Sequence, residues 1–337
     1  MNKRFIFLIF VISYAVFVSC NSNSRDVSLK NTKTISSVVH VESIINPEIN
    51  SQNSESNVMD LFGKDLSSAN FFARYVLGVS DASNPEAALI ANTFLSDSIV
   101  QKAYAAVDSV FNNKKMDKEM ESAFHYFNYH FPKHPLPKIY TVVSGFNNNL
   151  FYNSEEIGIS LDRYLGADCD FYPLLGIPSY KYTKMTPSQI PLDVVDLWLR
   201  IQFPLSIKKR QLVDHLIYEG KIIYAMSYCF PDLPLYRMIG YSEDQWRWCL
   251  DSESGMWNYV VDQKLLFDTS RLLIQKMVRP APFTNFFTPK SPGQCGRWIG
   301  LRIIQSYMKR NPKCTLQELL HEGNASKILN QSGYAPL

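Results

Sequence analysis

The chain has 337 residues, of which 46% are hydrophobic and 19% charged, and its formal net charge at pH 7 is +3. This is the composition of a well-packed soluble protein. Removal of Lys3 and Arg4 would lower the charge by two, so the composition excludes binding to nucleic acid or anionic lipid that is driven by a long-range field.

The first residues have the features of a secretory signal. Lys3 and Arg4 precede a continuous apolar run, Phe5 to Val18, that is too short to span a bilayer comfortably. The run ends at a lipobox-like Phe-Val-Ser-Cys, so we predict a signal peptide over residues 1–19 and acylation of Cys20. An ordinary signal peptide or an uncleaved anchor is the alternative. Several acyl chains would fasten the mature protein stably to a membrane, facing an extracytoplasmic compartment.

Residues 20–57 are rich in Ser and Asn, which predicts a lipidated N-terminus followed by a flexible tether. Within it, Val38 to Ile45 alternates enough to form a short strand. No second linker or repeat follows, so residues 58–337 are expected to form a single domain.

Two amphipathic helices are predicted over residues 96–111 and 117–131. His125, His130 and His134 gather near the end of the second helix, but prolines interrupt the backbone there. Because their spacing matches no standard metal pattern, we assign them no metal.

Residues 138–144, 150–152 and 156–161 are expected to be strands of a small antiparallel ribbon. In the loop that follows, Asp162, Asp168 and Asp170 could hold a hard cation, although the glycine and glutamate of an EF-hand are missing. The other interpretation is a loop fixed by hydrogen bonds from side chains to backbone.

The stretch from Ser206 to Phe230 predicts a largely buried helix around which the chain is organised. His215 and Glu219 lie four residues apart on it, and Gly220 costs about 1 kcal/mol relative to alanine. A glycine in that position usually permits close approach to the backbone. A helix of this kind is similar to the second helix of zinc peptidases, whose glutamate completes a site begun by a His-Glu-x-x-His helix.

The partner of that zinc-peptidase helix is missing. No pair of the six histidines brackets a glutamate in this pattern, and the segment where it should lie offers only Asp193 and Asp196. A zinc site with three protein ligands therefore cannot be assembled from the expected helices, and we predict no catalytic residue, metal or cofactor. A hydrogen-bonded pair of His215 and Glu219 is the simplest interpretation.

The C-terminal third is expected to contain helices over residues 241–248, 257–267 and 268–277, then a loop rich in proline and aromatic residues, and a helix that ends near Met308. Gly293, Gly296 and Gly300 lie at the start of that last helix. They could admit an anion or an extended peptide to free backbone amides, or they could serve tight helix packing. The five cysteines after Cys20 have irregular spacing, which argues against a disulfide framework.

Four blocks together carry a family resemblance: Phe124 to Pro137, Ile157 to Gly166, Ile217 to Lys221, and Ala281 to Gly293. They resemble the gliding-motility lipoprotein GldB family of Bacteroidetes over essentially the whole mature chain. The resemblance implies a lipoprotein attached to the outer membrane and facing the periplasm. Its implied partners are other proteins of the gliding and type IX secretion machinery.

The same family is distantly similar to zinc peptidases, which implies a zincin-like α+β fold, mainly helical with a small antiparallel sheet. His215, Glu219, Gly220 and Trp298 would then mark a vestigial cleft without catalytic chemistry. We therefore expect a structural or interaction protein rather than an enzyme. The alternatives are a zinc-dependent peptidase and a binder of cell-envelope peptides or glycans, in which Trp298 and Phe286 would line a groove.

Overall fold

The computed structural model describes residues 29, 32–35, 37–45, 58–63, 65–208 and 210–336. The predicted signal peptide, the predicted acylation site Cys20 and much of the predicted tether lie outside the described residues. The thiols of Cys169, Cys229, Cys249, Cys295 and Cys314 are all free.

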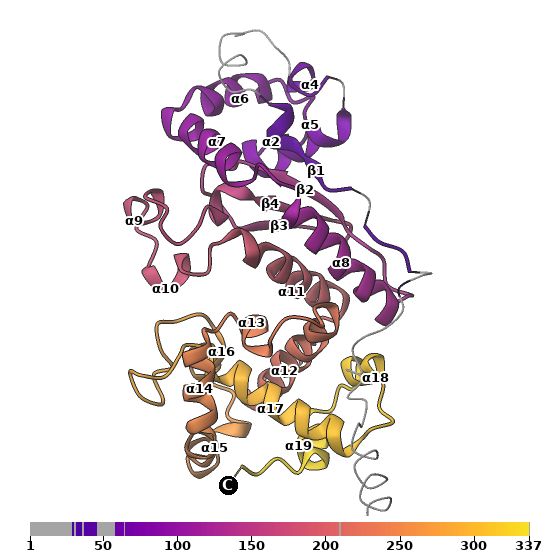
Figure 1. The fold of residues 1–337 in the computed structure, drawn as a ribbon, viewed down its shortest axis with the longest axis vertical. Helices are drawn as coiled ribbons and strands as arrows, with labels where there is room; N and C mark the ends of the chain where they lie inside the picture. The colour runs from indigo at the N-terminus through magenta and orange to yellow at the C-terminus, as the bar shows by residue number, and fades with distance from the viewer. Residues whose placement is uncertain are drawn as a thin grey trace, which may run out of the picture. The chain divides into compact units, whose positions relative to one another are not determined.

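Helices dominate both halves of the described chain (Figure 1). The N-terminal half contains α2 (Val41–Ile44), α4 (Val58–Leu61), α5 (Leu66–Phe72), the π-helical turn η1 (Ala73–Leu77), α6 (Ala87–Ser96), α7 (Ser98–Val110), α8 (Lys115–His130), the 3₁₀ turn η2 (Leu161–Tyr164), α9 (Phe171–Leu174) and α10 (Ser179–Tyr182). The C-terminal half contains the 3₁₀ turn η3 (Pro187–Gln189), α11 (Ile190–Gln202), α12 (Leu212–Cys229), α13 (Leu235–Ile239), α14 (Glu243–Asp251), α15 (Glu253–Asp262), the 3₁₀ turn η4 (Leu265–Phe267), α16 (Arg271–Val278), α17 (Cys295–Arg310), α18 (Leu316–His321) and α19 (Ala325–Ser332).

Four strands form one sheet in the order β1–β2–β4–β3: β1 (Val39–His40), β2 (Lys138–Val142), β3 (Leu150–Tyr152) and β4 (Glu156–Ser160). The α+β class is thereby confirmed, but the predicted antiparallel sheet is wrong. Only β3 and β4 are antiparallel, whereas β2 runs parallel to β1 on one side and to β4 on the other. Residues 143–155 supply the crossover that a parallel pair needs, and β3 lies within that crossover.

Residues 39–45 contribute to the sheet and the core. Val39 and His40 pair with Tyr140 and Thr141 of β2, and the chain then turns into α2. The strand is therefore shorter than the one predicted over residues 38–45. Val41 and Ile45 are buried, so this part of the predicted tether packs onto the domain.

The predicted helix positions agree with the structure where the sequence carries a cap. Asp97 precedes α7, and its carboxylate accepts hydrogen bonds from the backbone N–H groups of Ile99 and Val100 at 2.7 and 3.2 Å. Ser242 caps α14 in the same way, accepting from Gln245 at 3.2 Å. Local hydrogen bonds thus mark these helix starts.

Helix α12 lies at the centre of the C-terminal half, as predicted. It contacts α8, α11, α16, α17 and α19, and most of its residues are buried. It begins six residues later than the predicted segment, because the backbone N–H of Gln211 donates to the Asp214 carboxylate and closes the first turn there. Figure 1 shows α17 packed beside α12.

Candidate functional site

Four charged side chains from three helices meet where α11, α12 and α17 pack together: Asp196 and Arg200 of α11, Glu219 of α12, and Arg297 of α17. We call them the ion cluster. Arg200 donates to both oxygens of Glu219, at 2.9 and 2.7 Å, and to both oxygens of Asp196, at 2.6 and 3.1 Å. Arg297 donates to Asp196 at 3.0 Å. Two guanidinium groups therefore bridge two carboxylates across three helices.

The contact between Arg297 and Glu219 has a different character. The Nε of Arg297 lies 2.9 Å from the nearer Glu219 oxygen, yet this nitrogen makes no aligned hydrogen bond. We therefore treat the contact as a charge interaction rather than a hydrogen bond.

The partners within the cluster favour the charged forms of Asp196 and Arg200. Burial opposes the charge of Asp196, but the adjacent Arg200 and Arg297 outweigh it and hold the pKa of Asp196 below its usual value. Burial likewise opposes the charge of Arg200, but Asp196 and Glu219 together raise its pKa. Two negative and two positive groups compensate one another, which is the condition under which buried charge is tolerated.

This arrangement leaves Glu219 engaged with arginine rather than available as a metal ligand. Its side chain is 12% exposed, and both oxygens accept from Arg200. In the part of the chain that the structure describes, no three His, Cys, Asp or Glu side chains come together as a group that could hold a metal ion.

His215 lies one turn before Glu219 and lines a cavity of about 1080 Å³, which we call the His215 cavity. Arg200, Glu219 and Arg297 also line it. Burial lowers the pKa of His215, against the opposing effect of Glu219, so the imidazole is neutral at pH 7. The structure thus brings His215 and Glu219 to the same cavity. Among the described residues no hydrogen bond joins the two side chains, so the predicted hydrogen-bonded pair is wrong.

Gly220 lies at the crossing of α12 and α17. A Cβ on Gly220 would lie 2.2 Å from the backbone oxygen of Gly300, and a Cβ on Gly300 would lie 1.9 Å from the backbone oxygen of Leu216. A Cβ on Gly296 would come within 2.8 Å of the Met277 oxygen. These glycines serve close packing of backbone against backbone, one of the two interpretations that the sequence left open for Gly296 and Gly300.

Trp298 lies apart from the other predicted cleft residues. Its side chain is fully buried, packs edge-to-face against Trp246 at 6.1 Å and lies under the Arg302 guanidinium at 5.7 Å. The structure does not bring it to the His215 cavity, so it offers no surface to a ligand there.

Asp162 is buried, and its carboxylate accepts from the backbone N–H groups of Ser144 and Phe146. Asp168 and Asp170 are exposed. The loop therefore follows the hydrogen-bonded interpretation. Burial raises the pKa of Asp162 to about 6, against the opposing effect of these N–H groups.

Sequence reasoning missed both arginines of the ion cluster. Asp196 and Arg200 are spaced i,i+4 on α11, and this spacing could have indicated a pair on one helix face. No local signal linked that pair to Glu219 or to Arg297, because each comes from a different helix.

The fold and site define a helical α+β domain whose centre is held by a compensated ion cluster. The family model described as gliding motility protein GldB matches residues 23–336, so the chain belongs to this family. No curated protein and no solved structure matches it, and the zincin-like fold stays a prediction. Within the described residues, none of the helices combines the length and the apolar character needed to cross a membrane.

Proposed function

We propose that this protein is a lipid-anchored, non-catalytic component of the gliding motility machinery, linked to type IX secretion. Membership of the GldB family supports the role in motility. The lipobox at Cys20 supports attachment to a membrane through acyl chains. The outer membrane and its periplasmic side are what the resemblance to the family implies.

The ion cluster is the observation that carries the non-catalytic part of this proposal. A zinc peptidase of the expected type needs its helix glutamate as a ligand. Here Arg200 and Arg297 both contact the Glu219 carboxylate. A Zn²⁺ ion bound to Glu219 would be repelled by these two positive charges and would have to displace at least one of them. The same side chains instead connect α11, α12 and α17 through ion pairs, which suits a structural or interaction role.

Two measurements test the proposal. The first replaces the chromosomal gene with a Cys20→Ala variant in a gliding member of the Bacteroidetes and measures membrane fractionation and colony spreading. We expect the unacylated protein to leave the membrane fraction and spreading to be lost. Normal spreading with a soluble variant would show that anchoring is irrelevant to function.

The second measurement addresses the alternative of a zinc-dependent peptidase. The protein is purified without chelator, and its zinc content is compared with that of a Glu219→Ala variant. We expect neither to hold stoichiometric zinc. Stoichiometric zinc in the wild type that is lost in Glu219→Ala would favour the peptidase instead.

A further inference from the structure

The His215 cavity adjoins a second cavity, of about 720 Å³, which we call the Lys184 cavity. Asp196, Pro280, Gln294 and Arg297 line both of them. Arg297 and its partner Asp196 therefore stand between two connected parts of one concave surface, which we call the double groove.

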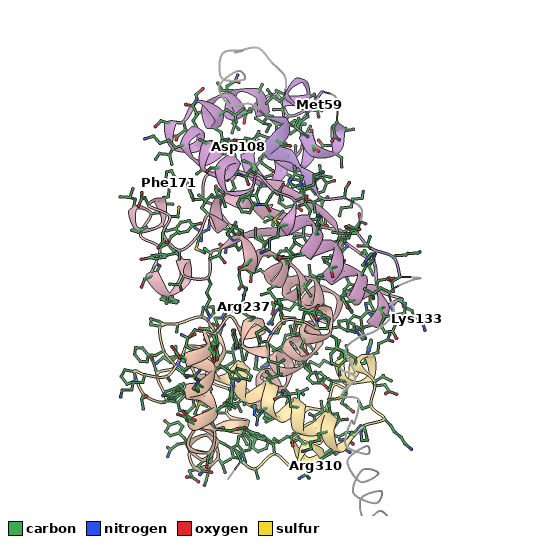
Figure 2. All side chains as sticks on the ribbon, viewed as in Figure 1. Met59, Asp108, Lys133, Phe171, Arg237 and Arg310 are labelled. Carbon is green, nitrogen blue, oxygen red and sulfur yellow. The ribbon has the colours of Figure 1, made fainter. Side chains whose placement is uncertain are left out.

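The Lys184 cavity is lined by cations that no carboxylate of the described residues contacts in a salt bridge. Arg163, Lys181, Lys184 and Arg237 line it, and none of them forms a salt bridge with a described residue. Arg163 and Arg237 donate only to neutral oxygens, those of Asn149, Phe146 and Ser188. Figure 2 labels Arg237, on α13 between the α9–α10 segment and the C-terminal helices.

The His215 cavity repeats this pattern. Besides Arg200 and Arg297 of the ion cluster, Arg210, Arg271 and Arg279 line it, and these three also lack a carboxylate partner among the described residues. Seven unpaired cations thus face the double groove from both of its halves.

The three acidic residues that line the double groove are already satisfied. Asp196 and Glu219 belong to the ion cluster, and Asp193 accepts from the Tyr164 hydroxyl at 2.8 Å and from the Gln189 amide at 2.9 Å. Nine basic and three acidic side chains give the double groove a net charge of +6 with His215 neutral. The whole chain carries +3, so the rest of it sums to −3. Positive charge is concentrated here on an otherwise slightly acidic protein, which favours an anionic ligand.

We propose that the double groove binds an extended acidic segment of a partner polypeptide. This inference rests on the proposed role as an interaction component and names the chemistry of its partner. Carboxylates would pair with the seven free cations, as Asp196 and Glu219 already pair with Arg200 and Arg297.

The apolar parts of the walls favour a polypeptide over a bare polyanion. Ile207 lines the His215 cavity and is 91% exposed, and Ile274, Val278 and Pro280 lie along the same wall. The Lys184 cavity adds Ala281 and Pro282, neither of which is buried. A segment that alternates acidic and apolar side chains would cover these surfaces while neutralising the cations.

Fluorescence anisotropy with the full mature chain in detergent tests this inference. The probe is a labelled twelve-residue peptide of alternating Glu and Leu, and the matched probe carries Gln in place of Glu. We expect the acidic peptide to bind, its affinity to fall as salt is raised, and the Gln peptide to bind much more weakly.

The variant Arg271→Gln/Arg279→Gln removes two exposed, unpaired cations of the double groove. Its matched control, Lys309→Gln/Lys313→Gln, makes the same charge change at exposed positions outside both cavities. Two exposed ion pairs predict about fivefold weaker binding in the arginine variant. The control is expected to bind like the wild type.

Three results would overturn the inference: no binding of the acidic peptide, equal binding of the Gln peptide, or equal losses in both variants. Inorganic polyphosphate and vesicles containing phosphatidylglycerol are titrated in parallel. Tighter binding of either one, lost in the arginine variant, would replace the acidic polypeptide with a phosphate-bearing ligand. The Cys20→Ala spreading assay does not involve the double groove, so the proposed function and this inference can fail separately.

Discussion

The crossing of α12 and α17 makes a quantitative prediction for the variant Gly300→Ala. The new methyl group would lie 1.9 Å from the Leu216 carbonyl oxygen and 3.1 Å from the Gly220 nitrogen, both of which are backbone atoms that no side-chain rotation can move. An ordinary contact needs about 3.4 Å or more, so the two helices must move apart by more than 1 Å.

Overpacking of this kind costs typically about 1–3 kcal/mol, and a clash with backbone belongs at the upper end of that range. Alanine recovers about 1 kcal/mol through its higher helix propensity. We therefore expect Gly300→Ala to lower the free energy of unfolding by about 2 kcal/mol. For a domain of about 280 residues the melting temperature should fall by about 3–4 °C.

Gly255 of α15 provides the matched control. A Cβ built there meets nothing within 4 Å, so Gly255→Ala keeps the propensity gain without the clash. It should stabilise the protein by about 0.4–1 kcal/mol. Urea denaturation and calorimetry of both variants measure the difference. If Gly300→Ala proved as stable as Gly255→Ala, the glycines would not be required for helix approach and the reasoning would be refuted.

Three further predictions concern polar groups. The pKa of His40 is raised from 6.5 to about 9, chiefly by its hydrogen bond to Glu42. Protonated His40 therefore contributes its full stabilisation to the folded state below pH 6.5, and this contribution is lost as the pH rises towards 9. The stability difference between wild type and His40→Gln should therefore shrink over that interval in urea titrations, and a difference independent of pH would contradict it. Asp162→Ala leaves the backbone N–H groups of Ser144 and Phe146 without their acceptor, so it should lower the free energy of unfolding by about 2–4 kcal/mol. Asp162→Asn should cost less, because its amide oxygen still accepts. Equal losses of stability in urea denaturation of the two variants would count against this assignment. Glu219→Gln removes one charge from the partly exposed ion cluster and should destabilise the folded protein by about 1–3 kcal/mol. Breaking a fully buried pair would cost more, about 3–5 kcal/mol. An unchanged melting temperature would show that Glu219 adds no stability through the cluster.

The sequence predicted the elements whose signals are local. Asp97 and Ser242 marked helix starts, and the apolar spacing from Leu212 onward marked α12. The parallel pairing of β2 with β4 could not be predicted in this way. The β-branched and aromatic residues of β2 and β4 indicate strands, but residue type does not distinguish a parallel from an antiparallel neighbour.

The candidate site shows the same division between local and distant information. The position of Glu219 on a buried helix and the close approach at Gly220 could be deduced from their own neighbourhood. The partners of Glu219 could not, because Arg200 precedes it by 19 residues on α11 and Arg297 comes from α17. The double groove was beyond sequence reasoning for the same reason, since its cations come from segments spread between residues 163 and 297.

The glycine crossing and the ion cluster depend on each other. Glu219 adjoins Gly220 on α12, and Arg297 lies one turn before Gly300 on α17, so the contact that brings the two backbones together also sets the distance between these charges. A separation of more than 1 Å would pull Arg297 from Glu219 and leave a partly buried charge poorly compensated. Arg297 also stands between the two cavities, so the same helix approach fixes the middle of the double groove. The helix approach around Glu219 and Gly220 thus positions the basic surface of the double groove.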